Sequence, residues 1–233
     1  MLRAFFAVPL IVLGTVILGV PALLLGLLDG SGDTAHRIAQ QWARLILRTC
    51  GVRVLVRGAE NVPAGPAVYA ANHGSALDIP ILFGHLPVSF RIIYKRSLSA
   101  IPFLGWYLYL GGHIAIDRGS PFKAKRSLTS AAERIRGGTS VAVFPEGTRS
   151  PDASVRLFKR GSFQLALNAG VPVVPVSLVG VKRIVPRGIL TLRQGTVELR
   201  VHPTVPTAHR SAADAEALAE EVKGTVERGC LEA

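Results

Sequence analysis

An uncharged apolar run near the start of the chain restricts the possible folds more than any other feature of the sequence. The run, Ala4–Leu28, holds 19 apolar side chains among its 25 residues. As a helix it would be ~37 Å long, which is enough to cross a hydrocarbon core of ~30 Å. Pro9 and Pro21 disturb an ideal helix because proline lacks a backbone donor and clashes with the preceding turn. The sequence therefore predicts a membrane-associated helical segment, either one kinked span or two short helices embedded in one leaflet.

A cleaved secretory signal is the alternative explanation of this run, since Arg3 supplies a minimal basic start. The run is longer than the apolar stretch of about 7–15 residues that is usual in signals, and no clear A-x-A cleavage site follows it. We therefore expect the segment to remain part of the protein.

The next segment has the periodicity of a basic amphipathic helix. Its apolar stripe consists of Ile38, Trp42, Leu45 and Thr49. The adjoining polar stripe consists of Arg37, Gln41, Arg44 and Arg48. Such a helix can lie at an anionic membrane surface with its aliphatic stripe toward the lipid, or it can pack on the protein's own core with a solvated basic edge. The preceding apolar run favours the membrane surface, so we assign residues 1–50 to membrane attachment.

The rest of the chain is strongly basic. The whole sequence carries 27 Lys and Arg against 15 Asp and Glu, a formal net charge of +12. The last 23 residues hold six acids and two bases, so Gly30–Arg210 carries 24 bases against 8 acids, a charge of +16. A body with this charge favours an anionic partner.

Cysteine usage and metal-ligand spacing restrict the chemistry further. Cys50 and Cys230 are too few for a disulfide framework, and no C-x-x-C or H-E-x-x-H run predicts a structural metal. A reducing, cytosolic environment fits this composition best.

Short β-rich runs alternate with helical patterns beyond residue 50. The β-rich runs are Arg53–Arg57, Ala67–Ala71, Phe90–Tyr94, His113–Ile116, Ser140–Phe144, Val173–Leu178 and Thr196–Val201. The helical patterns are Pro121–Arg136, Gly161–Ala169 and Ala213–Val226. This alternation predicts an α/β fold with a mostly parallel sheet flanked by helices. Ligands bind beyond the strand ends of such sheets, so we expect the chemistry in the loops that follow the strands.

The loop after Ala67–Ala71 contains a histidine and an aspartate five positions apart. His73 and Asp78 would be ~140° out of phase on a regular helix, so they meet only if a turn separates them. Gly74 permits that turn, and Pro80 favours a helix that begins near Asp78. A carboxylate on one imidazole nitrogen would stabilise the cation that forms when the other nitrogen takes a proton. The pair is a candidate general base, although a structural histidine and a helix N-cap at Asp78 explain the same residues.

Two further loops combine glycine with cationic side chains. The run Phe144–Ser150 follows a predicted strand, and Phe158–Ser162 opens a predicted helix. Gly147 lets backbone N–H groups approach an anion, Arg149 offers a fork that matches phosphate oxygens, and Lys159 adds charge. Taken singly, each loop is better explained as a solvated surface turn; together they form a candidate anion site.

Acidic side chains accompany these cations. Glu146 could hydrogen-bond a substrate hydroxyl or hold an arginine in place. The predicted strand His113–Ile116 ends in Asp117 and Arg118, where the aspartate could orient the arginine. Both acidic residues therefore belong to the candidate site.

These loops, in this order, resemble the motifs of the glycerolipid acyltransferase family, and specifically of its 1-acyl-sn-glycerol-3-phosphate acyltransferases. Asn72–Asp78 is similar to the first motif, N-H-x-S-x-x-D, and Phe144–Ser150 matches the third. Gly112–Arg118 is similar to the second, G-x-x-F-I-D-R, except that Ala115 stands where the family usually has an aromatic residue. Val171–Val176 resembles the fourth motif. The resemblance covers about residues 50–200 and implies an acyltransferase domain over residues 51–233.

The resemblance implies roles for the motif residues. His73 would be the catalytic base and Asp78 its partner. Together with the cationic loops, it indicates a set of substrate-binding residues: Lys95, Arg118, Glu146, Gly147, Thr148, Arg149 and Lys159. Neither a metal nor a cofactor is implied.

The implied reaction is acyl transfer from acyl-CoA or acyl-carrier protein to the 2-hydroxyl of lysophosphatidic acid, giving phosphatidic acid for phospholipid biosynthesis. We expect it at the cytoplasmic face of a membrane, the inner membrane if the chain is bacterial, with the bilayer as a partner and no nucleic acid. One alternative is acylation of another lysolipid, such as a lyso-aminolipid. Another is a non-catalytic binder of anionic lipid or nucleic acid, which the absence of a recognised nucleic-acid module disfavours.

Overall fold

A seven-stranded sheet organises the protein. The computed structural model describes residues 2–117, 121–152, 154–186 and 191–231, and within them the strands run in the order β1-β7-β6-β2-β5-β3-β4. The strands are β1 (Val52–Arg57), β2 (Val68–Ala71), β3 (Phe90–Lys95), β4 (Ile114–Ile116), β5 (Ser140–Val143), β6 (Val173–Val179) and β7 (Gly195–Val201). All neighbours pair in parallel except β6 and β7, which are antiparallel. The predicted sheet is confirmed, with each strand within one residue of its predicted run at either end.

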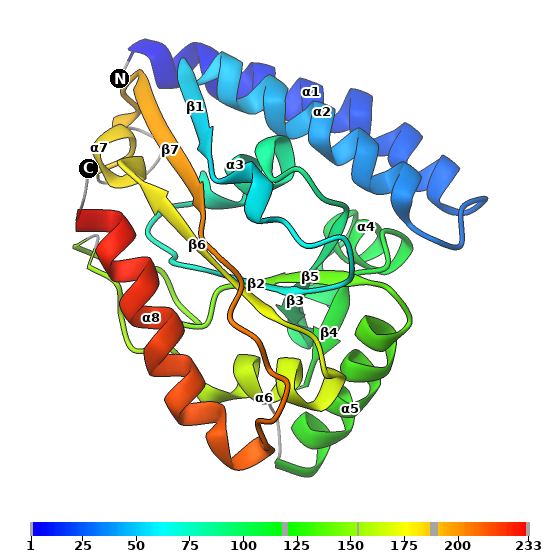
Figure 1. Ribbon diagram of the computed structural model, residues 1–233. Helices are drawn as coiled ribbons and strands as arrows, with labels where there is room; N and C mark the ends of the chain where they lie inside the picture. Colours follow the sequence, from blue (N-terminus) through cyan, green and yellow to red (C-terminus); the bar gives the residue numbers. More distant parts are fainter. Residues whose placement is uncertain (1, 118–120, 153, 187–190, 232–233) are drawn as a thin grey trace.

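Helices cover both faces of this sheet (Figure 1). They are α1 (Leu2–Gly26), α2 (Asp33–Thr49), α3 (Asp78–His85), α4 (Leu104–Leu110), α5 (Pro121–Arg136), α6 (Arg160–Ala169), α7 (Val181–Ile184) and α8 (Ala215–Leu231). Buried residues of α2 and α3 pack on one face, and those of α5, α6 and α8 pack on the other. Short 3₁₀ turns lie at Ala59–Asn61, Arg96–Ala100 and Ala212–Asp214.

The central strand β2 is buried on both faces, as a strand covered by helices on each side must be. Tyr69 and Ala71 belong to the hydrophobic cluster beneath α2 and α3, whereas Val68 and Ala70 belong to the opposite cluster. Because β5 and β6 both run parallel to β2, the loops that leave all three strands emerge at one edge of the sheet. That edge carries the candidate site.

Helix α1 continues through both of its prolines, so the structure contains one long helix rather than two short ones. Its window Pro9–Gly26 has a mean hydropathy of 2.3 and is 17% buried, and by length and composition it could cross a membrane. The face that packs on the protein is made of small residues: a Cβ added at Gly14 would lie 2.7 Å from the Leu45 side chain, and one at Gly26 would lie 3.2 Å from Leu110. Glycines therefore let α2 and α4 approach this helix closely.

Helix α2 runs beside α1 (Figure 1), and Leu45 of its apolar stripe lies against Gly14 of that helix while 40% of the Leu45 surface remains exposed. The indole Nε1 of Trp42 donates a 2.9 Å hydrogen bond to Thr15 Oγ1 on α1. The face of α2 that enters the core is instead its alanine face, with Ala39 and Ala43 buried in the cluster shared with α3. The stripe therefore contacts α1 through Trp42, and its position at a membrane surface stays a prediction, because periodicity identifies an apolar stripe but not everything that covers it.

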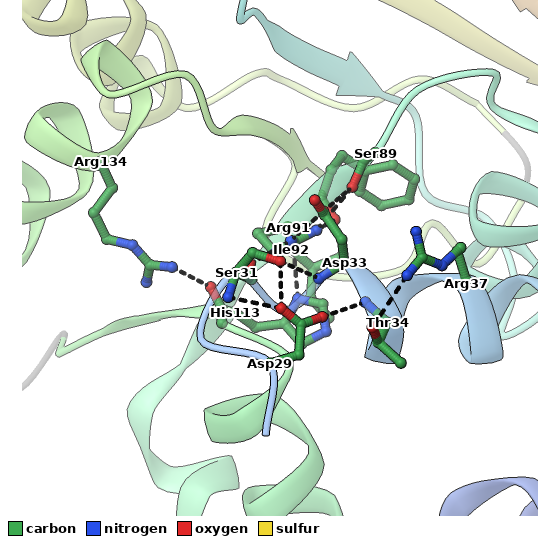
Figure 2. A network of polar contacts seen from close by, with 12 residues as sticks. Asp29, Ser31, Asp33, Thr34, Arg37, Ser89, Arg91, Ile92, His113 and Arg134 are labelled. Carbon is green, nitrogen blue, oxygen red and sulfur yellow. Dashed lines mark hydrogen bonds and ion pairs between the residues drawn. The ribbon is translucent and has the colours of Figure 1, made fainter. Parts of the chain in front are cut away.

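A polar network fastens the α1–α2 turn to the amino-terminal end of β3 (Figure 2). The buried guanidinium of Arg91 donates 2.8 Å and 2.7 Å hydrogen bonds to Asp33 Oδ1 and to the carbonyl of Ser31. The Arg91 hydrogen bond is the main reason that the pKa of Asp33 lies below its ordinary value. Nearby, the backbone N–H of Ile92 donates to Nδ1 of His113 at 3.0 Å. The helical pair α1–α2 is thus attached to the sheet through buried polar groups as well as through apolar packing.

Candidate functional site

The loop that leaves β2 is fixed in place by Asn72. Its side-chain amide pairs with the backbone of Leu178 on β6, accepting at 2.8 Å from the N–H and donating at 3.1 Å to the carbonyl. A buried amide satisfied on both of its polar groups holds a loop rigidly, because breaking either bond leaves a desolvated partner. The residue that follows, His73, is therefore presented from a fixed point.

His73 and Asp78 meet across the predicted turn. Nδ1 of His73 lies 2.8 Å from Oδ2 of Asp78, and the same oxygen accepts 2.8 Å hydrogen bonds from the backbone N–H groups of Gly74 and Ser75. Asp78 is the first residue of α3 and is 1% exposed, and its other oxygen, Oδ1, has no hydrogen-bond partner among the described residues. A carboxylate held by three donors keeps Nδ1 protonated and leaves Nε2 of His73 as the proton acceptor.

The imidazole is held flat as well as anchored. Its ring stacks on Phe144 with centroids 4.1 Å apart and planes inclined by 19°. The His73 side chain is 16% exposed, so the ring is partly sheltered but reachable from outside. This combination of a fixed tautomer, a fixed plane and an accessible edge is what general-base chemistry requires.

Glu146 lies beneath the His73 loop. Its Oε1 accepts a 2.8 Å hydrogen bond from the backbone N–H of His73, and the residue is 3% exposed. Burial raises the pKa of this carboxyl group, and the hydrogen bond from His73 opposes that shift. The carbonyl of His73 in turn accepts a 2.7 Å hydrogen bond from the backbone N–H of Ser150. The loop after β5 therefore binds both the N–H and the carbonyl group of His73.

The cationic residues of the predicted anion site lie along the outer rim of these loops. Gly147 has a φ of 72°, and a Cβ there would lie 2.8 Å from Nζ of Lys159, so this glycine makes room for the lysine. Thr148, Arg149 and Lys159 are exposed. Lys95, at the end of β3, is also exposed, and among the described residues neither it nor Arg149 forms a hydrogen bond or ion pair with the His73 loop. Arg118 lies outside the described residues.

A cavity of about 240 Å³ lies beside Asp78, and two of the residues that line it, Lys182 and Arg183, are not part of any predicted site. Asn72, Lys182 and Arg183 border it, the last two from the short helix α7 that follows β6. The signal was present in the sequence, since Gly180 and two cations follow a predicted strand just as Gly147 and Arg149 do. A larger hollow of about 490 Å³ lies at the ends of β1 and β7 and includes none of the residues around His73.

Nothing in the described part of the chain groups three or more His, Cys, Asp or Glu side chains so that they could hold a metal ion. The polar groups at the site are the imidazole of His73, the buried carboxyl groups of Asp78 and Glu146, and the exposed cations Arg149 and Lys159. Such a set can accept a proton from a hydroxyl group and hold an anionic substrate next to it.

The chain is similar in sequence to known acyltransferases. The sequence profile of the acyltransferase family matches residues 53–179. A 1-acyl-sn-glycerol-3-phosphate acyltransferase of Chlamydomonas reinhardtii is 38% identical over 181 residues, which cover 75% of this chain and 54% of that protein. An enzyme of the same name from Pseudomonas aeruginosa is 37% identical over 145 residues, 60% of this chain and 56% of that protein.

A solved structure extends the similarity to almost the whole chain. The 1-acyl-sn-glycerophosphate (LPA) acyltransferase PlsC from Thermotoga maritima superimposes with a TM-score of 0.83 at 30% identity, covering 99% of this chain and 94% of that one. By contrast, the chain spans about half the length of the first curated relatives it matches.

Proposed function

This chain belongs to the acyltransferase family, and from that membership we propose that it transfers a fatty acyl group to the 2-hydroxyl of 1-acyl-sn-glycerol 3-phosphate (lysophosphatidic acid), giving phosphatidic acid. The observation that carries the proposal is the 2.8 Å contact between His73 Nδ1 and Asp78 Oδ2, in a loop that borders exposed cations. Relatives named for this reaction share 32–38% identity with the chain.

The proposed chemistry is direct transfer. Nε2 of His73 takes the proton of the 2-hydroxyl while that oxygen attacks the thioester carbonyl of the donor. The new ester bond forms as the carbon–sulfur bond breaks, and the departing thiolate receives the proton from the imidazolium. Asp78 stabilises the imidazolium between these steps, and no covalent bond to the enzyme is required.

We assign the acceptor phosphate to the cationic rim after β5. Arg149 and Lys159 are exposed there and can reach an anion from two sides of Gly147, whose positive φ turns the loop outward. Thr148 offers a hydroxyl on the same loop. Lys95, at the end of β3, and Arg118, which the motif resemblance implies, complete the proposed set. The donor is acyl-CoA or acyl-carrier protein, both of which are anionic and suit a body of charge +16.

We propose that residues 1–50 hold the enzyme at a bilayer, with the acyltransferase domain on the cytoplasmic face. Leu13, Ile17 and Leu24 of α1 expose 55%, 58% and 60% of their surface. Trp106 and Tyr109 of α4, the helix that packs on the end of α1 at Gly26, are also exposed, and aromatic side chains of this kind prefer the membrane–water boundary. A lysolipid acceptor could then reach His73 without its acyl chain leaving the lipid.

A turnover assay tests the proposal. Purified full-length protein in detergent is given lysophosphatidic acid and labelled acyl-CoA, or acyl-carrier protein in a parallel arm, and labelled phosphatidic acid is extracted. The His73→Ala variant is the control for contaminating activity, and a lyso-aminolipid and a monoacylglycerol replace the acceptor in matched reactions. Turnover on the lyso-aminolipid alone would reassign the acceptor, and no His73-dependent turnover on any lysolipid would overturn the function.

A further inference from the structure

Strand β2, which leads into the His73 loop, has a neighbouring strand on each side, and a cationic loop follows each neighbour. The function proposed above assigns a role to only one of these two loops. In the sheet, β2 lies between β5 and β6, and it is parallel to both. The loop after β5 supplies Glu146 and Arg149. The loop after β6 supplies Lys182 and Arg183, at the same edge of the sheet but on the opposite side of the His73 loop.

A cavity of about 240 Å³ joins this second loop to the catalytic residues. One wall is the His73 loop itself, through Asn72, Gly74 and Asp78. Other lining residues come from the end of β6 and the start of α7 and include the apolar residues Leu178, Val179 and Val181. The cavity therefore has a polar inner end at Asp78 and aliphatic side chains in its lining.

The inner end holds an unsatisfied acceptor. Asp78 is 1% exposed, and its Oδ1 has no hydrogen-bond partner among the described residues, whereas Oδ2 has three. Oδ1 is itself covered by protein atoms, so this wall of the cavity offers a ligand no free acceptor at Asp78.

The mouth of the cavity is cationic. Lys182 is half-buried and Arg183 is exposed, and neither forms an ion pair within the described part of the chain. Gly180 precedes them with a φ of 80°, and a Cβ there would lie 3.0 Å from Nη2 of Arg183, so the missing side chain leaves space for the guanidinium to fold over the loop. Unpaired cations at the entrance attract an anionic group and leave the interior to the less polar part of the same ligand.

We propose that this cavity binds the phosphopantetheine arm of the acyl donor. Lys182 and Arg183 hold the phosphate at the mouth, and the apolar part of the lining packs against the methyl and methylene groups of the arm. The inference rests on the proposed function, because it assigns the acceptor phosphate to the other side of His73. Placing two anionic substrates on opposite sides of the catalytic loop keeps their like charges apart while both reach the imidazole.

The test separates donor from acceptor. In the double variant Lys182→Ala/Arg183→Ala we expect the donor KM to rise at least tenfold, with kcat and the acceptor KM within about threefold of the wild type. The Arg126→Ala variant, which removes an exposed cation from α5, is the matched control and should change neither KM. The Lys182→Arg/Arg183→Lys variant keeps both charges and should recover most of the donor affinity.

A binding measurement makes the result independent of turnover. Titration calorimetry with CoA, 4′-phosphopantetheine and pantetheine should show that the double variant loses affinity for the first two by at least tenfold, while pantetheine, which lacks the phosphate, binds both proteins equally weakly. A raised acceptor KM with an unchanged donor KM, or equal CoA affinity in both proteins, would overturn the assignment. If the wild type acylates no lysolipid but binds CoA, and the double variant loses that binding, the cavity remains a CoA-binding site and the proposed function is rejected.

Discussion

The buried carboxyl group of Glu146 accepts a 2.8 Å hydrogen bond from the backbone N–H of His73, the residue that carries the candidate base. The motif resemblance implies a substrate contact for Glu146, but at 3% exposure the side chain faces the catalytic loop from below. We therefore propose that Glu146 positions His73 rather than binding substrate directly.

Replacing Glu146 distinguishes these two roles. Glu146→Ala leaves the His73 N–H without its acceptor in a buried place, so we expect kcat to fall by about tenfold or more while the acceptor KM changes little. Glu146→Gln keeps a side-chain oxygen for that N–H and should restore most of the lost kcat. Initial rates with each substrate varied in turn provide the comparison. If Glu146→Ala raises the acceptor KM and Glu146→Gln does not restore it, Glu146 binds the substrate directly.

Removing the candidate base should abolish turnover without unfolding the protein. We expect His73→Ala to lower kcat by about 10²–10⁴-fold, because the neighbouring carboxyl groups of Asp78 and Glu146 are buried and cannot replace Nε2 as the proton acceptor. Asp78→Asn should be nearly as damaging, since the imidazole then loses the charge that stabilises its protonated form. Turnover is measured alongside the unfolding midpoint in detergent, and activity of His73→Ala within a few-fold of the wild type would refute direct base catalysis.

The exposed cations Arg149 and Lys159, in the loop after β5, should contribute mainly to binding of the phosphorylated acceptor. Arg149→Ala and Lys159→Ala each remove a charge-assisted contact, so we expect the acceptor KM to rise by about tenfold and the donor KM to stay nearly constant. The assay compares lysophosphatidic acid with monoacylglycerol, which lacks the phosphate. If the variants impair both acceptors equally, the two cations do not bind the phosphate.

The buried histidine beside Arg91 should make the fold sensitive to acid. Burial, assisted by the nearby positive charges of Arg91, His36 and Arg134, lowers the pKa of His113 to about 3. Its Nδ1 accepts the N–H of Ile92, so the folded protein keeps this ring neutral. Below pH ~6.5 the unfolded chain binds a proton that the folded chain does not, and stability falls by up to about 1.4 kcal/mol per pH unit.

Denaturation in detergent between pH 6.5 and 5 measures this slope. His113→Asn keeps an acceptor for the Ile92 N–H but cannot titrate, so its stability should depend less on pH than that of the wild type. His209→Asn, at an exposed position, is the matched control and should leave the slope unchanged. His36, whose pKa burial lowers to about 4, should leave a residual slope in the first variant. Identical slopes in all three proteins would contradict a neutral buried His113.

Membrane attachment should depend on the outward face of α1. Leu13→Glu/Ile17→Glu places two charges on side chains that are more than half exposed, and it leaves intact the glycine face that packs on α2. We expect most of the variant to separate from anionic liposomes in flotation, whereas the wild type stays bound after a high-salt wash because apolar insertion is not screened. Leu231→Glu, on a leucine of α8 that is still more exposed, is the control. Salt release of the wild type would show that α1 is not embedded.

Local sequence was sufficient for the strands, for the longer helices and for the contact between His73 and Asp78, whereas the short helices α4 and α7 were not predicted. Helix α5 occupies Pro121–Arg136 as predicted, and the strands follow the β-rich runs, because both depend on periodicity and on turn residues close by in the chain. His73 and Asp78 were also predictable, since Gly74 and Pro80 lie between or beside them and determine the turn through local geometry.

What the sequence by itself determined, then, was the type and order of the elements and the chemistry of each loop; the tertiary structure decided which of them meet. Periodicity marks the Trp42 stripe of α2 as apolar but does not say that α1 covers it. Glu146 lies 73 positions from His73, and Lys182 and Arg183 are more than 100 positions from Asp78, yet the strand order β6-β2-β5 brings all of them to one edge. Strand order depends on how helices pack across the whole sheet, a long-range balance of burial that no local pattern contains.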